Sequence, residues 1–412
     1  MSLKFQFVKV DMSQAIDVVI DRNSDIVRYG SDNMAPQKLL ELSTQSALHT
    51  AILSRKTKMG VGEGFYYNAE ENAKTDLFMK HPNPYESLDD ILLKCYTDLE
   101  IFGGFSLNVV WSKNKNSIAE LYHRPFQNFR SPKADKNGMV DFYYYYDNWK
   151  KYTRYNDVEI FSRFADKNKA KPQVLYAKKY SSENIYYPIP SYVGGLADIN
   201  TLHQISTFHN SCISNNFQPG LMILYKGPRP DAEKQDAIVA ALEEKYQGSD
   251  KAGTPGIFFL ENDEEINLEQ TQVSDLDKQY TTITEGIKEN VVLAHEIPRI
   301  VAGLEKSGSL GGSKEIVEAR QVFYNDYVKL NQNFLLKQFN QIMDINGLEQ
   351  LEIKNSSPSL FLYSESLLSQ ILTKNEIRNM FGFDDLEDGL NEEGDEVIDE
   401  DVDKKIIDKD GE

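Results

Sequence analysis

The sequence predicts an α+β fold, and three observations support this prediction. Apolar residues recur at helical spacing near the start of the chain, and strand-forming residues dominate between residues 120 and 180. Two further helical patterns flank a small β-α-β pattern, and a very long helical pattern follows them. The chain of 412 residues, of which 40% are hydrophobic, is long enough to bury a sizeable core.

Helices are predicted first along the chain. An apolar pattern of helical period begins near residue 34 and ends at the glycine-rich stretch Gly60–Phe65. A second helix follows a proline-rich loop, with Ser87 as its N-cap. A glycine break then leads to a strand that ends near Trp111.

Strands follow between residues 120 and 180. Asn137-Gly138 predicts a hairpin turn because both residues tolerate positive φ. Tyr143–Tyr146 are good strand formers on either face of a sheet. The chain up to about residue 195 is therefore predicted to form an α+β unit.

The next part of the chain predicts two helices around a compact module. The first helix, 196–219, has one apolar stripe and stops at Pro219-Gly220. The module, 220–273, has a β-α-β pattern, and the second helix, 274–297, stops at Pro298.

The segment Gly303–Glu315 is rich in glycine and serine and is predicted to be mobile. The long helix after it runs from about Lys314 to Ile345, with Asn346-Gly347 as its end. Its apolar and aromatic side chains indicate core or subunit packing rather than a cofactor site.

The chain is acidic, with a net charge of −19, and much of this charge lies in its last part. Residues 386–412 carry 13 acidic residues and 3 lysines, a composition typical of disorder. A short helix pair is predicted between about Ser364 and Phe381.

Candidate chemistry is sparse. His203 and His209 are six residues apart, so on a helix they point in different directions and do not suit a shared metal ion. His295 precedes Pro298, and a helix-end role is favoured over that of a general base. Gly60–Phe65 follows a helix and therefore suits a turn better than a dinucleotide loop.

Recognised enzyme motifs are absent from the sequence. It has no P-loop, H-E-x-x-H, G-x-S-x-G or C-x-x-C pattern. Its two cysteines, Cys95 and Cys212, fit a reducing compartment without a disulfide framework or a zinc site. No apolar run is long enough for a transmembrane helix, and no signal peptide is predicted. We therefore predict no catalytic, cofactor-binding or metal-binding residues, and no enzyme activity.

Three stretches in this order give the sequence a resemblance to a known family: Asp32–Phe65, Tyr187–Gly220 and Leu293–Leu335. The chain resembles the portal proteins of tailed bacteriophages over roughly residues 28–381. The resemblance implies the following parts: 1–195 (N-terminal part of the wing), 196–219 (first stem helix), 220–273 (clip), 274–297 (second stem helix), 298–315 (tunnel loop), 316–363 (long helix and completion of the wing), 364–385 (short crown) and 386–412 (acidic disordered tail).

The resemblance also implies a function in the virion. A ring of typically about twelve subunits is expected at one capsid vertex, assembled in the host bacterial cytoplasm. Double-stranded DNA is expected to pass through its channel during packaging and ejection. The implied partners are the terminase large subunit, the major capsid protein and scaffold, and head-tail adaptor proteins, with no membrane.

The tunnel loop supplies the candidate channel residues, which are Lys306, Ser307, Ser309 and Lys314. A mostly acidic wall avoids the tight phosphate contacts that lysine and arginine make, so DNA can slide. Two other classes remain open: a different connector or adaptor ring protein of the virion, and an enzyme acting on nucleic acid. The order of helices around the module disfavours the first, and the absence of nucleotide and metal motifs disfavours the second.

Overall fold

The computed structural model describes part of the chain, and the description below is limited to that part: 18–20, 24–68, 72–153, 158–164, 172–182, 185–214, 222–226, 256–260, 276–304, 313–355, 373 and 375. The chain divides into two units, 1–357 and 358–412. Apart from residues 373 and 375, the described residues all belong to the first unit. The predicted short crown, with the exception of these two residues, and the acidic tail lie outside the described residues.

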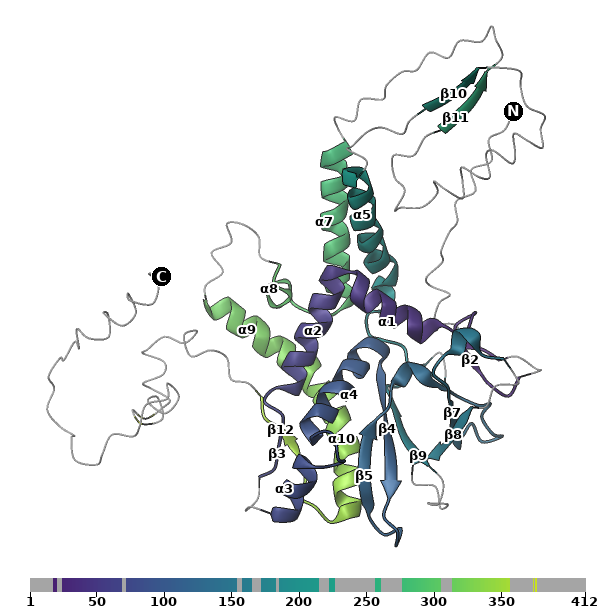
Figure 1. The fold of residues 1–412 in the computed structure, drawn as a ribbon. Coiled ribbons are helices and arrows are strands. Elements are labelled where there is room, and N and C mark those ends of the chain that lie inside the picture. The colour runs from purple at the N-terminus through teal and green to yellow at the C-terminus, as the bar shows by residue number, and fades with distance from the viewer. Residues whose placement is uncertain are drawn as a thin grey trace, which may run out of the picture. The chain divides into compact units, whose positions relative to one another are not determined.

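A six-stranded sheet, in the order β5-β4-β9-β8-β7-β6, is the main β-structure (Figure 1). Neighbouring strands pair antiparallel, except that β8 and β9 are parallel. The strands are β4 (Gly104–Trp111), β5 (Ile118–His123), β6 (Phe129–Arg130), β7 (Phe142–Tyr145), β8 (Glu159–Arg163) and β9 (Gln173–Lys178).

Local signals placed several of these strands correctly. The strand predicted to end near Trp111 is β4. A turn at Asn137-Gly138 lies between β6 and β7, and Gly138 has a φ of 77°. Asn137 does not adopt positive φ, so the left-handed conformation falls on the glycine alone, where the absence of a Cβ removes the steric penalty.

Two helices cover the face of the sheet that carries Phe105, Leu107 and Val109. They are α4 (Leu88–Phe102) and α10 (Lys329–Asn346), and their apolar side chains share one buried cluster with these strand residues. Alternate residues of a strand point to the same face, so β4 presents a continuous apolar surface to both helices.

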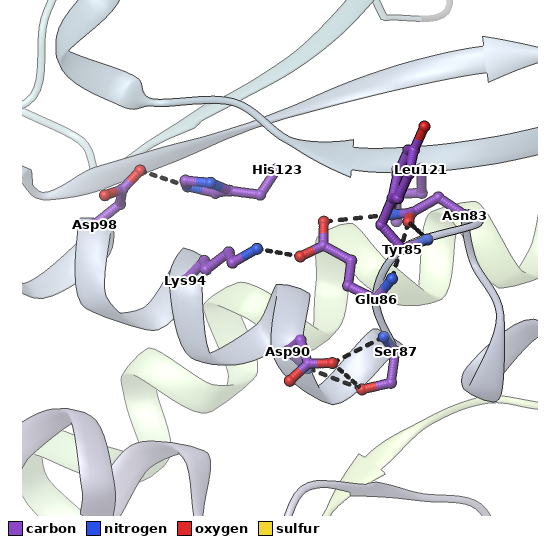
Figure 2. A network of polar contacts seen from close by, with 9 residues as sticks. All are labelled: Asn83, Tyr85, Glu86, Ser87, Asp90, Lys94, Asp98, Leu121 and His123. Carbon is purple, nitrogen blue, oxygen red and sulfur yellow. Dashed lines mark hydrogen bonds and ion pairs between the residues drawn. The ribbon is translucent and has the colours of Figure 1, made fainter.

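The first turn of α4 is fixed by polar contacts (Figure 2). Ser87 and Asp90 form a capping box, which confirms the predicted N-cap. Asn83 bonds the turn to β5, because its Nδ2 donates to the carbonyl oxygen of Leu121 (2.8 Å). Farther along α4, Asp98 Oδ2 lies 2.8 Å from His123 Nε2, which joins the helix to β5.

The helix predicted from residue 34 is in fact two helices, α1 (Ala35–Gln45) and α2 (Ala47–Val61). Ser46 between them is extended, with φ −99° and ψ 110°. Its N–H bonds to Leu42 and its carbonyl accepts from Thr50, so the backbone groups stay satisfied at the break. The break turns α2 away from the direction of α1. α2 ends at Gly62, where φ is 57°, as a turn at Gly60–Phe65 requires.

Short elements complete this part of the fold. β3 (Phe65–Tyr66) pairs antiparallel with β12 (Glu352–Ile353), so the chain after the long helix returns to its beginning. The others are β1 (Val18–Val19), β2 (Arg28–Tyr29), α3 (Ala73–Lys80) and the 3₁₀ turns η2 (Phe126–Asn128), η3 (Trp149–Lys151) and η4 (Val193–Gly195).

The two predicted stem helices are α5 (Leu196–Ser214) and α7 (Leu276–Ala294), which lie side by side (Figure 1). We call them the helix pair. Gly195, immediately before α5, faces Ala294 at the end of α7, so the two helices run antiparallel. A Cβ built on Gly195 would lie 2.5 Å from the Ala294 Cβ, so the close approach requires glycine.

Two parallel strands, β10 (Met222–Lys226) and β11 (Gly256–Leu260), lie between these helices in the sequence. Parallel pairing requires a crossover connection, as the predicted β-α-β module would supply. The predicted helix between the strands, and the predicted third strand of the module, lie outside the described residues.

The predicted long helix is confirmed, with an irregularity in its middle. α9 (Ser313–Phe323) continues through a π-helical turn, η6 (Tyr324–Val328), into α10. Gly347, in the left-handed conformation, ends it.

The segment 298–315, predicted as one loop, is partly helical. Helix α8 occupies Arg299–Ala302, and α9 already begins at Ser313. Pro298 has a φ of −58° at the N-cap of α8, and Gly303 ends it in the left-handed conformation. Residues 305–312 lie outside the described residues.

Candidate functional site at the base of the helix pair

The side chains of the channel residues predicted from the sequence lie outside the described part of the structure. Lys306, Ser307 and Ser309 lie outside the described residues. Lys314 lies in the first turn of α9, and only its backbone is described. The structure therefore leaves their role as a prediction.

The described segment before residues 305–312 is held firmly. The Arg55 Nη1 of α2 donates to the Val301 carbonyl oxygen (2.8 Å), and the Arg299 Nε donates to that of Leu304 (2.9 Å). Arg299 also forms an ion pair with Glu289 of α7. Helix α8 is thus fastened to both α2 and α7.

A buried histidine pair lies where the helix pair meets α2. The Nδ1 of His49, on α2, is 2.8 Å from the Nε2 of His295, which directly follows α7. Both rings contact the ring of Tyr192, which precedes α5. Both histidines are 0% exposed. One imidazole must donate and the other accept for this bond to form.

A second group of buried polar side chains lies close by, around Glu100 of α4. The Tyr327 hydroxyl donates to Glu100 Oε2 (2.6 Å) and Asn331 Nδ2 donates to Glu100 Oε1 (3.1 Å). Lys56 of α2 has its Nζ 3.8 Å from Glu100 Oε2 and 3.9 Å from the centre of the Tyr327 ring. The π-helical turn carries Tyr327, and such turns occur frequently at functional sites.

These two groups together form what we call the polar junction: His49, Lys56, Glu100, Tyr192, His295, Tyr327 and Asn331. Its members come from α2, α4, α10, η6 and the residues that flank the helix pair. The polar junction therefore ties the helix pair and the long helix to the α+β part of the unit.

Burial sets the protonation of the polar junction. It lowers the pKa of His49 to about 3, with a smaller effect from the nearby Lys56 charge. It lowers the pKa of His295 to about 2, again with Lys56 as a lesser cause. Burial also lowers the pKa of Lys56 to about 8, although Glu100 opposes this shift. Both histidines are therefore neutral at pH 7, while Lys56 is mostly protonated.

The arrangement suits mechanical support rather than catalysis. Neutral, fully buried imidazoles at neutral pH have no route to a substrate, and general bases must reach the proton that they remove. The His49 Nε2 and the His295 Nδ1 have no hydrogen-bond partner among the described residues. Buried polar atoms without a partner cost free energy, so a substitution that breaks the contact between the two rings should lower the stability of the fold.

Metal binding and membrane insertion find no support in the described part of the chain. No group of three histidine, cysteine or acidic side chains is close enough there to hold a metal ion. His203 is half-buried and its Nδ1 lies 3.3 Å from the Gln45 carbonyl oxygen, which agrees with the structural role predicted for it. None of the described helices combines the length and apolarity needed to cross a bilayer.

The sequence prediction missed most of the polar junction and misjudged one member. His295 was expected to interact with the helix dipole, but it is buried and neutral against His49. One signal was available: Ile52 and Lys56 are four residues apart on α2, so Lys56 lies on the apolar face of that helix.

Neither a protein-family model nor a curated protein matches the sequence. Solved structures do match it. A chain in the virion of a native gene transfer agent (GTA) particle is 13% identical, with a TM-score of 0.52, over 85% of this chain and 94% of that chain. A chain in the neck of an empty GTA particle, computed with C6 symmetry, is 15% identical, with a TM-score of 0.54, over 85% of this chain and 95% of that chain.

An HK97-family phage portal protein from Corynebacterium diphtheriae is 10% identical, with a TM-score of 0.40, over 81% of this chain and 98% of that chain. The two TM-scores above 0.5 show that this chain has the fold of a subunit of the GTA particle. The resemblance that the sequence indicated is supported at the level of the fold by these chains of a virion and of its neck.

Proposed function

We propose that this chain is a portal subunit of a phage virion. It assembles into a closed ring of about twelve copies, and double-stranded DNA passes through the central channel during packaging and ejection. The ring docks the terminase large subunit and later the head-tail adaptor proteins, and it contacts the major capsid protein and scaffold. The observation that carries this proposal is the fold shared, over 85% of the chain, with a subunit in the neck of a GTA particle.

The order of structural elements supports the proposal. An antiparallel helix pair rises from an α+β unit, a small strand module lies between its helices in the sequence, and a long helix follows. Contacts of His49 with His295 and of Arg55 with Val301 hold the chain before residues 305–312. We assign these residues, with Lys306 and Lys314, to the wall of the channel.

The charge of the chain also supports a channel through which DNA slides. A net charge of −19 disfavours tight phosphate binding, because each phosphate neutralised by lysine or arginine strengthens binding by counterion release. A few lysines in a ring can steady DNA without trapping it. An enzyme acting on nucleic acid has no comparable support, since the sequence lacks nucleotide-binding and catalytic motifs.

Electron microscopy and native mass spectrometry of the purified full-length chain test the proposal. We expect a closed ring with a central hole and a mass of about twelve subunits. We also expect no ATP hydrolysis by the ring, because a separate motor supplies the energy. A stable monomer at micromolar concentration would overturn the proposal, and intrinsic ATPase activity would overturn the passive channel.

A further inference from the structure

Two hollows lie side by side along α2, and they differ in chemistry. The first, of about 190 Å³, lies between α2, α8 and α9. Three cations line it, Arg55, Lys58 and Arg320, with apolar side chains such as Ile300 and Ile316 between them. None of the three cations forms an ion pair with a carboxylate among the described residues. We call this the cationic hollow.

The second hollow, of about 330 Å³, lies between α2 and α4 and shares Lys58 with the first. Its lining is mainly apolar, with Leu53, Leu93 and Ile101, and hydroxyl groups at Thr50 and Thr97. Leu93 is 47% exposed, which leaves apolar surface uncovered on this side of the unit. We call this the apolar hollow.

The long helix presents exposed side chains that could complement the two hollows, because one is acidic and others are apolar. Glu315 is exposed in the first turn of α9, and Val322 and Leu330 farther along are 56% and 63% exposed. Glu315 and Val322 are seven residues apart, which places them on one face about 10 Å apart. They point about 100° away from Ile316, which lines the cationic hollow, so the two surfaces face different directions.

We propose that the two hollows receive this face of the long helix from a second copy of the chain. Glu315 of one subunit pairs with Lys58 of its neighbour in the cationic hollow, and Val322 enters the apolar hollow. The inference deepens the proposed function and depends on it, because it assigns the contact between subunits of the ring. Different surfaces meet in such a contact, so it repeats head to tail and can close into a ring.

Charge and apolar surface together favour a second copy over other occupants. A DNA phosphate would match the cations but would leave Leu93, Val322 and Leu330 in water. The acidic residues 386–412 would match the cations in the same incomplete way. The long helix supplies both an acidic side chain, Glu315, and an apolar one, Val322, on the same face.

Charge reversal tests the inference by native mass spectrometry. We expect Lys58→Glu alone and Glu315→Lys alone to reduce the ring fraction at least tenfold at a concentration where the wild-type ring is complete. An equal mixture of the two variants should restore the ring, because each mutant surface then meets its complement in an alternating ring. The chain that carries both substitutions should also assemble. Lys150→Glu, an exposed lysine on η3, is the control and should leave the ring intact.

The outcomes distinguish an error in the proposed interface from an error in the proposed ring. If the wild-type ring forms and both single variants assemble equally well, the interface is wrong while the portal proposal stands. If the wild-type chain forms no ring, the portal proposal is wrong. Loss of DNA binding by intact Lys58→Glu rings would assign the cations to DNA and overturn the inference. Circular dichroism checks folding, and Val322→Glu, which leaves both charges in place, should also abolish the ring.

Discussion

His49 and His295 are 246 positions apart in the chain, yet their ring nitrogens lie 2.8 Å apart. His49 belongs to α2, and His295 directly follows the second helix of the helix pair. Tyr192, which precedes the first helix of the pair, packs against both rings. One buried contact therefore fixes both ends of the helix pair where they join the α+β part.

This contact makes stability depend on pH. Burial lowers the pKa of both histidines far below the ordinary value, to about 3 and about 2. Below about pH 6.5 the two histidines take up protons in the unfolded chain but stay neutral in the folded chain. The free energy of unfolding therefore falls as pH falls. The slope is up to about 1.4 kcal/mol per pH unit for each proton.

Urea denaturation between pH 8 and pH 5, at one protein concentration, measures this slope. The double variant His49→Gln with His295→Gln should be less stable at pH 8 and should show a flatter pH dependence. The variant His81→Gln, which replaces an exposed histidine, is the control and should keep the wild-type slope. An unchanged slope in the double variant would show that the pair titrates freely in the folded protein.

The buried pair of Lys56 and Glu100 predicts strong coupling between two substitutions. Lys56→Met leaves a buried carboxylate without its counter-charge, and Glu100→Gln leaves a buried ammonium in the same condition. Each single change should lower the free energy of unfolding by about 3–5 kcal/mol. The double variant should lose clearly less than the sum, because neither charge is then left unpaired.

A double-mutant cycle from urea denaturation measures the coupling. The matched control is the exposed pair Lys288 and Glu285 on α7, whose atoms are 2.7 Å apart. Its substitutions should change stability by less than about 1 kcal/mol, since water screens exposed pairs. Simple additivity at Lys56 and Glu100 would contradict the proposed coupling.

The double glycine before α5 predicts a sharp contrast between neighbouring positions. Gly195→Ala would bring a Cβ to 2.5 Å from the Cβ of Ala294, far inside ordinary contact, and should destabilise the protein by about 1–3 kcal/mol. Gly194→Ala meets nothing within 4 Å and should be neutral. Adding Ala294→Gly should rescue Gly195→Ala, because it removes the colliding atom. Thermal unfolding midpoints of the wild type, the two single glycine variants and the double variant measure these effects. Equal effects at the two glycines would refute the close contact.

Much of the fold could be predicted because its signals are local. Ser87 was predicted as the N-cap of α4, and it forms a capping box with Asp90 three residues farther on. The long helix was expected from about Lys314 to Ile345 and spans Ser313–Asn346. Periodicity and a terminal glycine were sufficient to place it, since both act within a few residues.

The rest depends on distant contacts that periodicity does not encode. Ser46 is extended between α1 and α2, although the apolar pattern of the sequence continues through it. The contact of His49 with His295 joins segments that are independent in the sequence. The prediction for Lys306 used the composition of its loop and the family resemblance, and the residue lies outside the described part of the chain.

The assignment of residues 305–312 to the channel wall predicts a defect in DNA handling rather than in assembly. Lys306 and Lys314 would repeat around the ring and form circles of positive charge in an otherwise acidic chain. Their contact with phosphate should be weak and should weaken further with salt.

We expect Lys306→Ala with Lys314→Ala to leave the ring mass unchanged in native mass spectrometry and to alter the amount of DNA packaged or retained in filled heads. The control, Lys74→Ala with Lys150→Ala, removes the same charge from exposed sites on α3 and η3 and should behave as wild type. Normal packaging and retention in the test variant, with a salt dependence equal to that of the control, would remove these lysines from the channel wall.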